Sequence, residues 1–246
     1  MDTIKQAIIS AGGLGTRLRP ATDTMPKPMI PILGKPILQW HVEQFKKFGV
    51  AEFFFALHHL PKVVMDHFGD GSKFGVNIRY LVEKEPLGTA GGMKKFEPQL
   101  DEEFFYIYGD TFSLMNYGKM EAAWRALSGR AIGIQRVGRS ESYADVDIAE
   151  LDAQKKITAI HPKPHDRRYA DAYRMRGSFI FSKKILSYIP EDVPYEIGRQ
   201  LLPDIVAHGE AFYGYECDDY SKGIDTVEKW KEVEEYLIQL RRNPRP

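Results

Sequence analysis

Short apolar runs alternate with amphipathic stretches through the first half of the chain. The apolar, β-prone runs predict strands at 6–10, 52–57, 77–82 and 104–108. Between them, apolar residues at helical spacing predict helices over 37–48 and 62–68, and Pro36 is well placed to start the first of these. Strands that alternate with helices are typical of βαβ units, so this half predicts a mostly parallel sheet.

The second half of the chain is richer in strand patterns and has fewer helical stretches between them. Its apolar runs predict strands at 131–137, 146–151, 156–160 and 172–181. Helical spacing predicts helices over 184–189, 195–208 and 227–241, and we expect the tail 243–246 to fray. The buried side of the last helix would carry Trp230, Val233, Tyr236, Leu237 and Leu240.

The two halves together predict one α/β domain over residues 1–246, with a doubly wound, mixed and mainly parallel sheet of Rossmann-like type. In such sheets, ligands bind beyond the carboxyl ends of the strands. Two polar motifs fall at that edge of the predicted sheet. One is a glycine-rich segment after the first strand, and the other is Gly109-Asp110 after the strand at 104–108.

Composition and charge narrow the class of protein. The 246 residues are 43% hydrophobic, which is enough for a sizeable core. Lys plus Arg and Asp plus Glu both number 34, and this balance argues against a nucleic-acid-binding surface. The single cysteine, Cys217, excludes an intrachain disulfide and a cysteine-rich metal site. No membrane span and no signal-peptide pattern is seen, so we expect a cytoplasmic protein without a membrane partner.

The glycine-rich segment, residues 11–28 (AGGLGTRLRPATDTMPKP), is the most informative part of the chain. Its glycines let backbone N–H groups approach an anion closely, and Arg17 and Lys27 add two positive charges. A structural turn needs one or two glycines but not these cations, so the segment favours binding of a phosphate chain. It matches neither the P-loop pattern nor G-x-G-x-x-G.

The string AGGLGTRLRP, followed by PKPMIPILGKPIL, resembles the signature of the sugar-1-phosphate nucleotidyltransferases, or nucleotide-sugar pyrophosphorylases. Four further segments continue the resemblance in order: EPLGTAGG at 85–92, YGD at 108–110, HPKP at 161–164 and GIDT at 223–226. It implies that a nucleoside triphosphate and a sugar 1-phosphate react to give a nucleotide-sugar and pyrophosphate. It also implies a nucleotide-binding half over about 1–115, a sugar-phosphate-binding half over about 116–246, and Mg²⁺ as cofactor.

The resemblance assigns roles to the residues of the first half. Arg17 would neutralise the β- and γ-phosphates as pyrophosphate leaves, and Lys27 would contact the α-phosphate under attack. Gly88 and Thr89 would line the base pocket, although Thr89 could instead cap a helix there. The nucleoside and the start of the phosphate chain would be held by Ala11, Gly12, Gly13, Gly15 and Thr16.

Two aspartates are the candidate metal ligands. Asp110 follows a predicted strand, although Gly-Asp is also a common turn pair. Many relatives carry D-x-G-T near the last helix, whereas this chain reads Gly223-Ile224-Asp225-Thr226, so its aspartate lies two places later. The resemblance makes Asp225 the second ligand, and the competing interpretation is an N-cap for the following helix.

The acceptor end departs from the family pattern. The resemblance implies that Lys163 binds the sugar phosphate and that Gly177 presents its backbone to the sugar. The alternative for Lys163 is a solvated lysine in a loop. Relatives often carry Glu-Lys-Pro where this chain has Pro162-Lys163-Pro164, and a proline cannot replace the glutamate that contacts sugar hydroxyls.

Several alternatives therefore stay open. The motif LGTAGG is typical of guanylyl- and thymidylyl-transferring relatives, whereas the motif IDT favours cytidylyl transfer. The base of the nucleoside triphosphate is therefore unassigned. The acceptor could be a non-sugar phosphate or a phosphonate, and the chain could be a non-catalytic nucleotide-binding regulatory homologue. An NAD-dependent oxidoreductase is disfavoured because G-x-G-x-x-G is missing. A homo-oligomer is compatible with the sequence.

Overall fold

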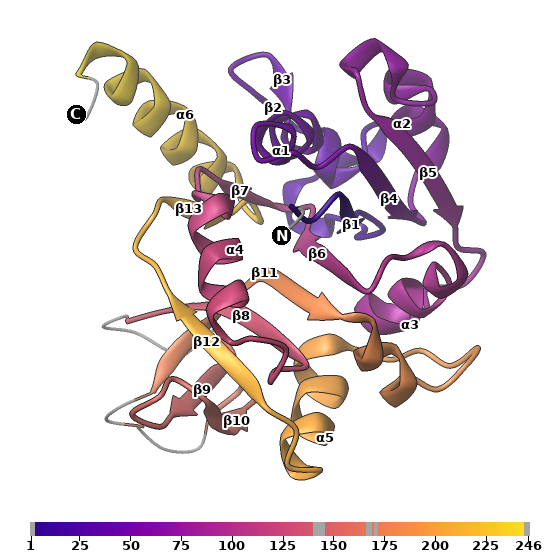
Figure 1. Ribbon diagram of the computed structural model, residues 1–246. Helices are drawn as coiled ribbons and strands as arrows, with labels where there is room; N and C mark the ends of the chain where they lie inside the picture. The colour runs from indigo at the N-terminus through magenta and orange to yellow at the C-terminus, as the bar shows by residue number, and fades with distance from the viewer. Residues whose placement is uncertain (1–2, 140–145, 166–168, 170–171, 244–246) are drawn as a thin grey trace.

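A nine-stranded sheet forms the centre of the computed structural model, which describes residues 3–139, 146–165, 169 and 172–243 (Figure 1). Its strands are β1 (Gln6–Ser10), β4 (Glu52–Leu57), β5 (Asn77–Val82), β6 (Glu103–Tyr108), β8 (Gly133–Gly138), β9 (Ile148–Leu151), β10 (Ile157–His161), β11 (Tyr173–Ser182) and β12 (Phe212–Glu216). The order along the main path is β10–β9–β11–β6–β1–β4–β5, with β8 paired to β11 and β12 paired to β8.

The first half of the chain builds the parallel part of this sheet. Strand β1 lies between β4 and β6 and is parallel to both, and β5 continues the parallel order beyond β4. The second half joins through β11, which runs antiparallel to β6, β8 and β9. The predicted mixed sheet of a doubly wound α/β fold is therefore confirmed, and β1 marks the point where the chain changes sides.

Helices cover both faces of the sheet. Apolar side chains of α1, α2 and α4 pack on one face, and those of α3 and α5 pack on the other. Among the described residues, no helix is long and apolar enough to cross a lipid bilayer. The helices are α1 (Ile37–Lys46), α2 (Pro61–Phe68), α3 (Gly88–Lys94), α4 (Tyr117–Ala126), α5 (Leu202–Ala207) and α6 (Val227–Arg242).

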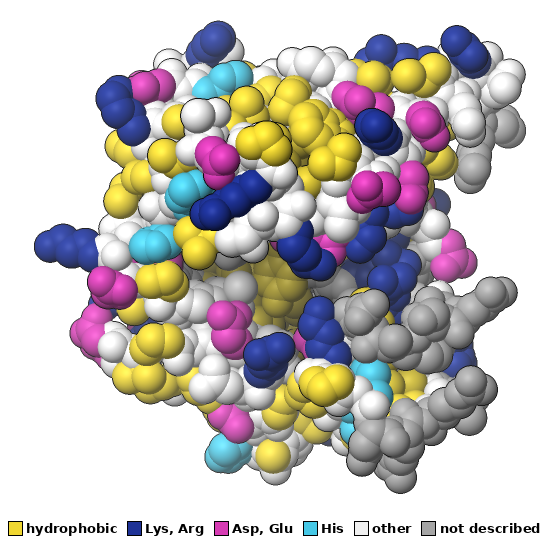
Figure 2. Space-filling view, turned by 180° about the vertical axis from the view of Figure 1, so that it is seen from behind, with side chains coloured by type: hydrophobic (Ala, Val, Ile, Leu, Met, Phe, Trp, Pro, Cys, Tyr) yellow, Lys and Arg dark blue, Asp and Glu magenta, His cyan; other side chains and the backbone are white. Residues whose placement is uncertain are grey.

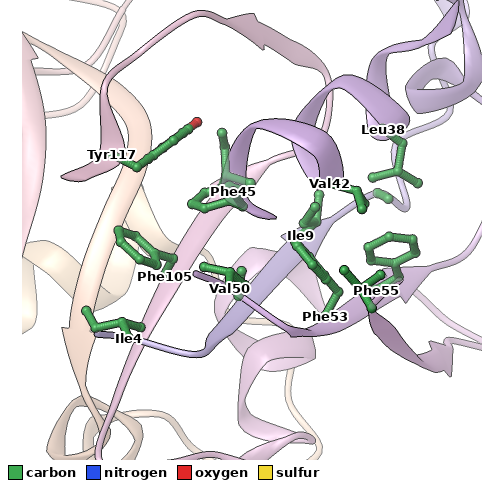
Figure 3. Close-up of a cluster of buried hydrophobic side chains, with 14 of the residues drawn as sticks. Ile4, Ile9, Leu38, Val42, Phe45, Val50, Phe53, Phe55, Phe105 and Tyr117 are labelled. Atoms are coloured by element: carbon green, nitrogen blue, oxygen red, sulfur yellow. The ribbon is translucent and has the colours of Figure 1, made fainter. Parts of the chain in front are cut away.

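Strand alternation distributes the core between these two faces. In β1, Ile9 packs with α1 and α4, whereas its neighbour Ile8 packs with α3 on the opposite side. Figure 3 shows the first cluster, in which the Phe45 ring stacks on Tyr117 with centroids 3.9 Å apart. Burying one such side chain stabilises the fold by roughly 1.5–3 kcal/mol, so both layers anchor the loops at the strand ends.

A small ribbon beside the main sheet brings distant segments together. Strand β7 (Thr111–Ser113) pairs antiparallel with β13 (Ser221–Gly223), and Gly223 lies opposite Thr111. Phe112 and Ile224 are fully buried in a third apolar cluster that also includes Val233 of α6. The ribbon therefore fixes the chain after β6 against the chain before α6. These three-residue strands were not predicted, because so short a run carries no periodicity.

Other elements correct the sequence prediction. The helix predicted at 184–189 is a 3₁₀ helix, η6 (Lys183–Tyr188). The prediction of one helix over 195–208 is wrong in its first part, where a π-helical turn, η7 (Ile197–Leu201), precedes α5. Pro203 lies at the start of α5 and has no N–H to donate, which interrupts a regular α-helical ladder.

One helix was considered only as an alternative, and two further elements were absent from the prediction. Helix α3 reads GTAGGMK, and its three glycines give it low helix propensity. The alternative of a helix start at this segment is confirmed, but the N-cap of α3 is Leu87 and not Thr89. Helix α4 and strand β12 were missed. The sequence carried a start signal for α4, because Asn116 caps this helix by accepting a hydrogen bond from Lys119 N at 3.0 Å. In α6, Val233 and Leu237 are buried as predicted, while of the tail 243–246 only Asn243 lies among the described residues.

Candidate active site

A cavity of about 500 Å³ opens where the parallel strands end, and its volume is within the roughly 300–1,000 Å³ usual for small-molecule sites. Figure 2 shows a hollowed face with hydrophobic side chains on its floor and Lys and Arg side chains beside it. The cavity is lined by Ser10, Ala11, Gly12, Gly13, Lys27, Pro28, Ala56, Glu83, Pro86, Gly88, Thr89, Tyr108, Asp110, Asp147, Glu196, Gly198 and Arg199.

The first part of the glycine-rich segment forms one wall of the cavity. Ala11 N donates to Ala56 O at 2.9 Å, so the chain leaves the sheet only after this residue. A Cβ on Gly12 would lie 3.3 Å from His58 Cβ, whereas a Cβ on Gly13 would meet no atom within 4 Å. The backbone at Gly13 therefore borders open space, as close approach of a phosphate requires.

Gly15 and Thr16 do not line the cavity. Gly15 has φ 61°, and a Cβ there would lie 2.9 Å from Thr22 Cγ2. Its carbonyl accepts a hydrogen bond from Thr22 Oγ1 at 2.9 Å, and Thr16 begins the short 3₁₀ helix η1 (Thr16–Leu18). Gly15 thus turns the chain after the binding wall, and the predicted contact of both residues with the nucleotide stays a prediction.

Lys27 and Asp110 form an ion pair at the edge of the cavity. Lys27 lies in the 3₁₀ helix η3 (Lys27–Met29), is only 8% exposed, and places its Nζ 2.6 Å from Asp110 Oδ2. Gly109 directly follows β6, and Asp110 comes next. A Cβ on Gly109 would lie 2.8 Å from Ser10 O, so this position packs closely against β1. The fold therefore holds a buried ammonium and a half-exposed carboxylate beside the glycine wall.

Asp225 lies next to this pair because of the β7–β13 ribbon. Ile224 N donates to Asp110 O at 3.0 Å, which fixes the segment that carries Asp225. Arg17 Nη1 is 3.0 Å from Asp225 Oδ2, and Lys229 Nζ is 2.6 Å from Asp225 Oδ1. Partial burial would raise the pKa of the Asp225 carboxyl, but the cations Lys229, Arg17 and Lys27 outweigh it and lower that pKa.

The alternative role for Asp225 belongs to its neighbour. The N-cap of α6 is Thr226, whose side chain accepts a hydrogen bond from Lys229 N at 3.3 Å. Asp225 therefore does not cap the helix, and its carboxylate is directed toward cations of three other segments.

His41 of α1 lies behind Asp110. It is only 1% exposed, and its Nε2 has no hydrogen-bond partner among the described residues. Burial lowers the pKa of His41 to about 4, although the Asp110 charge and a hydrogen bond with the Thr111 backbone act in the opposite direction. The imidazole is therefore neutral at physiological pH, so Lys27 is the cation that balances Asp110 from this side.

The two aspartates suit a particular kind of metal binding. Within the described ranges, no group of three or more His, Cys, Asp or Glu side chains is arranged to hold an ion. Mg²⁺ differs from metals held in all-protein cages, since it commonly takes one or two carboxylates plus substrate phosphates and waters. Asp110 and Asp225 fit that donor set, because carboxylate oxygens are hard ligands and Asp110 lines the cavity, whereas Asp225 lies beside Asp110 outside the cavity lining.

Helix α3 and the π-helical turn form the opposite wall. Gly88 has φ 73°, and a Cβ there would lie 2.6 Å from Tyr195 O. Thr89 Oγ1 donates to Glu196 Oε2 at 2.7 Å and accepts from Ile197 N at 2.9 Å. Thr89 therefore ties the two halves of the chain together, and in this structure its hydroxyl is already engaged rather than directed to a base.

Glu83 adds a half-buried carboxyl to this wall. It follows β5, and its Oε1 lies where a Cβ on Gly92 would come within 2.5 Å. Burial raises the pKa of Glu83, and the charge of Glu196 acts in the same direction, against the hydrogen bond from Leu87 N and the influence of His58. This end of the cavity thus offers a carboxyl that protonates more readily than an exposed one.

The residues predicted for the acceptor lie at the far side of the cavity. Lys163 N donates to Asp147 Oδ1 at 3.0 Å, so the exposed Lys163 lies directly beside a cavity-lining carboxylate. A Cβ on Gly198 would lie 2.7 Å from Asp147 Oδ2, and this close approach brings the π-helical turn against β9. Gly177 packs on the ring of Tyr108, where a Cβ would lie 2.2 Å from Tyr108 Cδ2, and it does not line the cavity.

Five charged or aromatic lining residues, Glu196 among them, were missed from the sequence. Glu83 and Tyr108 stand at the ends of β5 and β6, so the strand-end rule that selected Asp110 could have selected them too. Asp147 and Arg199 carried no such signal. Asp147 precedes an antiparallel strand, and Arg199 lies in a π-helical turn that the pattern had assigned to a regular helix.

Comparison with known proteins assigns the chain to a protein family. A protein-family model described as nucleotidyl transferase matches residues 6–233. A UTP–glucose-1-phosphate uridylyltransferase of Synechocystis sp. is 32% identical over 225 residues, which cover 87% of this chain and 58% of that protein. A mannose-1-phosphate guanylyltransferase of Mycobacterium tuberculosis is 30% identical over 90% of this chain and 61% of its own length. The chain thus spans about three-fifths of these relatives.

Solved structures share the fold. A UDP-glucose pyrophosphorylase complexed with UDP-glucose has a TM-score of 0.82 at 17% identity and covers 96% of this chain and 99% of its own. HddC from Yersinia pseudotuberculosis complexed with GMP-PN has a TM-score of 0.77 at 24% identity and covers 95% of this chain and 100% of its own. The resemblance noted in the sequence is confirmed at family level, and the chain belongs to the nucleotidyl transferase family.

Proposed function

We propose that this chain transfers a nucleoside monophosphate from a nucleoside triphosphate to a sugar 1-phosphate and releases pyrophosphate. An oxygen of the acceptor phosphate attacks the α-phosphorus, and the bond from that phosphorus to the bridging oxygen of the pyrophosphate breaks. The acceptor oxygen is already anionic, so no protein nucleophile is needed and catalysis rests on positioning and charge neutralisation.

The observation that carries the proposal is the meeting of three features in one cavity, with a second aspartate beside it. The open backbone of Gly13, the buried Lys27, and Asp110 all line it, and Asp225 is held beside Asp110 by the ribbon. A binder of nucleotides needs the backbone wall. It does not need a buried ammonium and two aspartates at the end where the phosphate chain would lie.

The cations have distinct places in this scheme. Lys27, whose Nζ is held 2.6 Å from Asp110, is positioned to neutralise charge on the α-phosphate, which increases in the transition state. Arg17 is largely exposed and pairs with Asp225, so it can move onto the leaving pyrophosphate without disturbing the core. Removing one fixed donor of this kind typically costs about 2.7–4 kcal/mol in the barrier.

Mg²⁺ is part of the proposal. Asp110 and Asp225 would hold the ion together with phosphate oxygens of the substrates, and the ion would supply charge neutralisation at the reacting phosphate. Lys27, Arg17 and Lys229 now balance these carboxylates, so this chain keeps the two anions ready without leaving either unpaired.

The acceptor side supports a hydroxyl-bearing substrate. Pro162 cannot contact hydroxyls, but the Asp147 carboxylate accepts from Lys163 N and lines the same cavity. Relatives are named for glucose 1-phosphate, mannose 1-phosphate and, in Campylobacter jejuni, D-glycero-alpha-D-manno-heptose 1-phosphate. These names support a sugar acceptor and leave both its identity and the base to experiment.

The test is pyrophosphate release with UTP, GTP, CTP and dTTP, each combined with a panel of sugar 1-phosphates, phosphocholine and a phosphonate. We expect release with at least one sugar 1-phosphate, and its loss when EDTA removes Mg²⁺. Activity with phosphocholine or the phosphonate alone would replace the sugar acceptor by a non-sugar one. Nucleotide binding without release in any combination would identify a non-catalytic homologue instead.

A further inference from the structure

Tyr108 brings an aromatic ring to the cavity. It is the last residue of β6, it is half-buried, and it lines the cavity. All lining residues belong to the described ranges, and among them Tyr108 alone has an aromatic side chain. The reaction proposed above rests on positioning and charge neutralisation at phosphates. That chemistry does not account for an aromatic ring in the cavity wall.

The neighbouring strand makes room for this ring. Ser178 of β11 lies opposite Ile107 of β6, and continuing the antiparallel register by one residue places Gly177 opposite Tyr108. A Cβ on Gly177 would lie 2.2 Å from Cδ2 and 2.8 Å from Cγ of Tyr108. The ring therefore occupies the space that a side chain at Gly177 would need, and only glycine lets the ring lie there.

Two buried rings fix the orientation of Tyr108. The centroid of the Tyr106 ring is 5.9 Å away with an interplanar angle of 87°, and that of Phe179 is 5.8 Å away at 66°. These are edge-to-face contacts, which aromatic pairs favour. Because both neighbours are buried, the part of the ring that they and Gly177 leave uncovered is the part that borders the cavity.

The Tyr108 hydroxyl lies within electrostatic reach of both ends of the cavity. Burial raises the pKa of this hydroxyl, and the charges of Glu196, Asp147 and Asp110 act in the same direction. Asp110 belongs to the phosphate end and Asp147 to the acceptor end, so Tyr108 lies between them. A sugar whose 1-phosphate is at Asp110 and whose hydroxyls reach Asp147 therefore passes over the ring.

We propose that Tyr108 is a specificity-determining residue whose uncovered ring face stacks on the acceptor sugar. This inference rests on the proposed function, because it assumes that the acceptor phosphate lies at Lys27 and Asp110. A pyranose has C–H groups on its faces and hydroxyls at its rim, so one face can cover the electron-rich face of the phenol while the hydroxyls reach Asp147. Gly177 then acts on the acceptor through Tyr108 rather than by contact with the sugar.

The acceptor class that follows is a phosphorylated sugar in its ring form. Calorimetry tests this without requiring turnover, with glucose 1-phosphate, mannose 1-phosphate and glucitol 6-phosphate titrated into the whole chain in the presence of Mg²⁺. Glucitol 6-phosphate is an open-chain polyol that offers a phosphate and hydroxyls but no ring face. We expect at least one cyclic probe to bind about tenfold more tightly than glucitol 6-phosphate.

Substitutions of Tyr108 connect that preference to the ring. Tyr108→Phe keeps the aromatic face and should retain the preference, whereas Tyr108→Leu removes the face and should reduce the preference about fivefold or more. Binding of UTP, GTP, CTP and dTTP, measured in the same way, should be unchanged in both variants. The matched control is Tyr188→Leu, because Tyr188 lies outside the cavity lining and donates to Glu210 Oε1 at 2.6 Å.

A double-variant cycle tests the positioning role of Gly177. The methyl group of Gly177→Ala would displace the Tyr108 ring, so it should weaken binding of the cyclic probe in the parent but not in Tyr108→Leu, where no ring is displaced. Thermal unfolding shows which variants fold. If Tyr108→Leu is unfolded, Tyr108→Met replaces it, since methionine adapts to irregular space without an aromatic face.

Four results would overturn the inference. The parent could bind cyclic and open-chain probes equally, or Tyr108→Leu could keep the preference. Tyr108→Phe could lose as much as Tyr108→Leu, which would assign recognition to the hydroxyl, or Tyr108→Leu could weaken only the triphosphates, which would place the nucleoside on the ring. The proposed function fails separately, by the absence of pyrophosphate release in the nucleotide and acceptor panel. A ring-dependent preference without release would keep the stacking face and reject the reaction.

Discussion

The two ends of the cavity are built in different ways. The phosphate end takes Gly12, Gly13 and Lys27 from one continuous segment and adds Asp110 from the next strand in the sheet. The acceptor end combines Asp147, Lys163 and Arg199, which come from a strand start, a loop and a π-helical turn. A contiguous motif suits the triphosphate that all such reactions share, whereas scattered segments can vary with the acceptor.

The two ends also differ in how their charges are held. At the phosphate end the ammonium of Lys27 is buried, and its carboxylate partner is fixed by backbone hydrogen bonds of the ribbon. At the acceptor end Lys163 and Arg199 are exposed. A buried pair reorganises little during reaction, which favours catalysis, whereas exposed cations adapt to the ligand and contribute to selection.

Replacing Asp110 should have the largest effect at the phosphate end. We expect Asp110→Ala to reduce pyrophosphate release by at least about 10³-fold while the fold is kept, because one of two metal carboxylates is lost and Lys27 loses its partner. Release assays and circular dichroism measure the two outcomes. Asp66→Ala, in an exposed pair with Lys62, is the control. Near-normal turnover in Asp110→Ala would remove Asp110 from the metal site.

Lys27→Ala should come next in magnitude. We expect kcat to fall about 10²–10³-fold while the dissociation constant of the nucleoside triphosphate changes much less, since Lys27 would act mainly on charge that develops in the transition state. Single-turnover kinetics and equilibrium binding separate the two quantities. Lys62→Ala provides a matched surface lysine. Equal losses in binding and in rate would show that Lys27 holds the ground state.

A pair of glycine variants contrasts the two ends directly. Gly13→Ala should lower activity at least tenfold with unchanged stability, because its Cβ meets no protein atom and would project toward a bound phosphate. Gly177→Ala should cost about 1–3 kcal/mol of unfolding free energy, since its Cβ would lie 2.2 Å from Tyr108 Cδ2. Thermal unfolding and release assays of both variants check this. A stability loss in Gly13→Ala would make the glycine wall structural.

The sequence predicted the phosphate end much better than the acceptor end, and the reason is physical. Strands 6–10, 52–57 and 77–82 have the predicted bounds. The first two are predictable because buried parallel strands are largely apolar runs, whereas 77–82 is a half-exposed edge strand that its β-prone residues reveal. Lys27 and Asp110 meet at the same edge of the sheet. The N-cap of α6 is Thr226 and not Asp225. Threonine and aspartate are both favoured N-cap residues, so the local sequence could not decide between them. Asp147 meets Lys163 and Gly198 only through tertiary packing, which no local pattern records.

Asp147→Asn should have the smallest effect and should act at the acceptor end alone. Asparagine can still accept from Lys163 N, so the local fold is kept, but it loses the negative charge that strengthens hydrogen bonds from acceptor hydroxyls. We expect the KM for the acceptor to rise about tenfold, equivalent to roughly 1.4 kcal/mol, with the KM for the nucleoside triphosphate unchanged. Steady-state kinetics with each substrate varied in turn provide both constants.

The control for Asp147→Asn is Asp152→Asn, because Asp152 also accepts from backbone N–H groups but lies in an exposed turn outside the cavity lining. A rise in the KM for both substrates of the Asp147 variant would show that the two ends are one continuous site, and the contrast between them would then be wrong. An effect on the acceptor alone would show that this carboxylate takes the place in acceptor binding that Pro162 cannot fill.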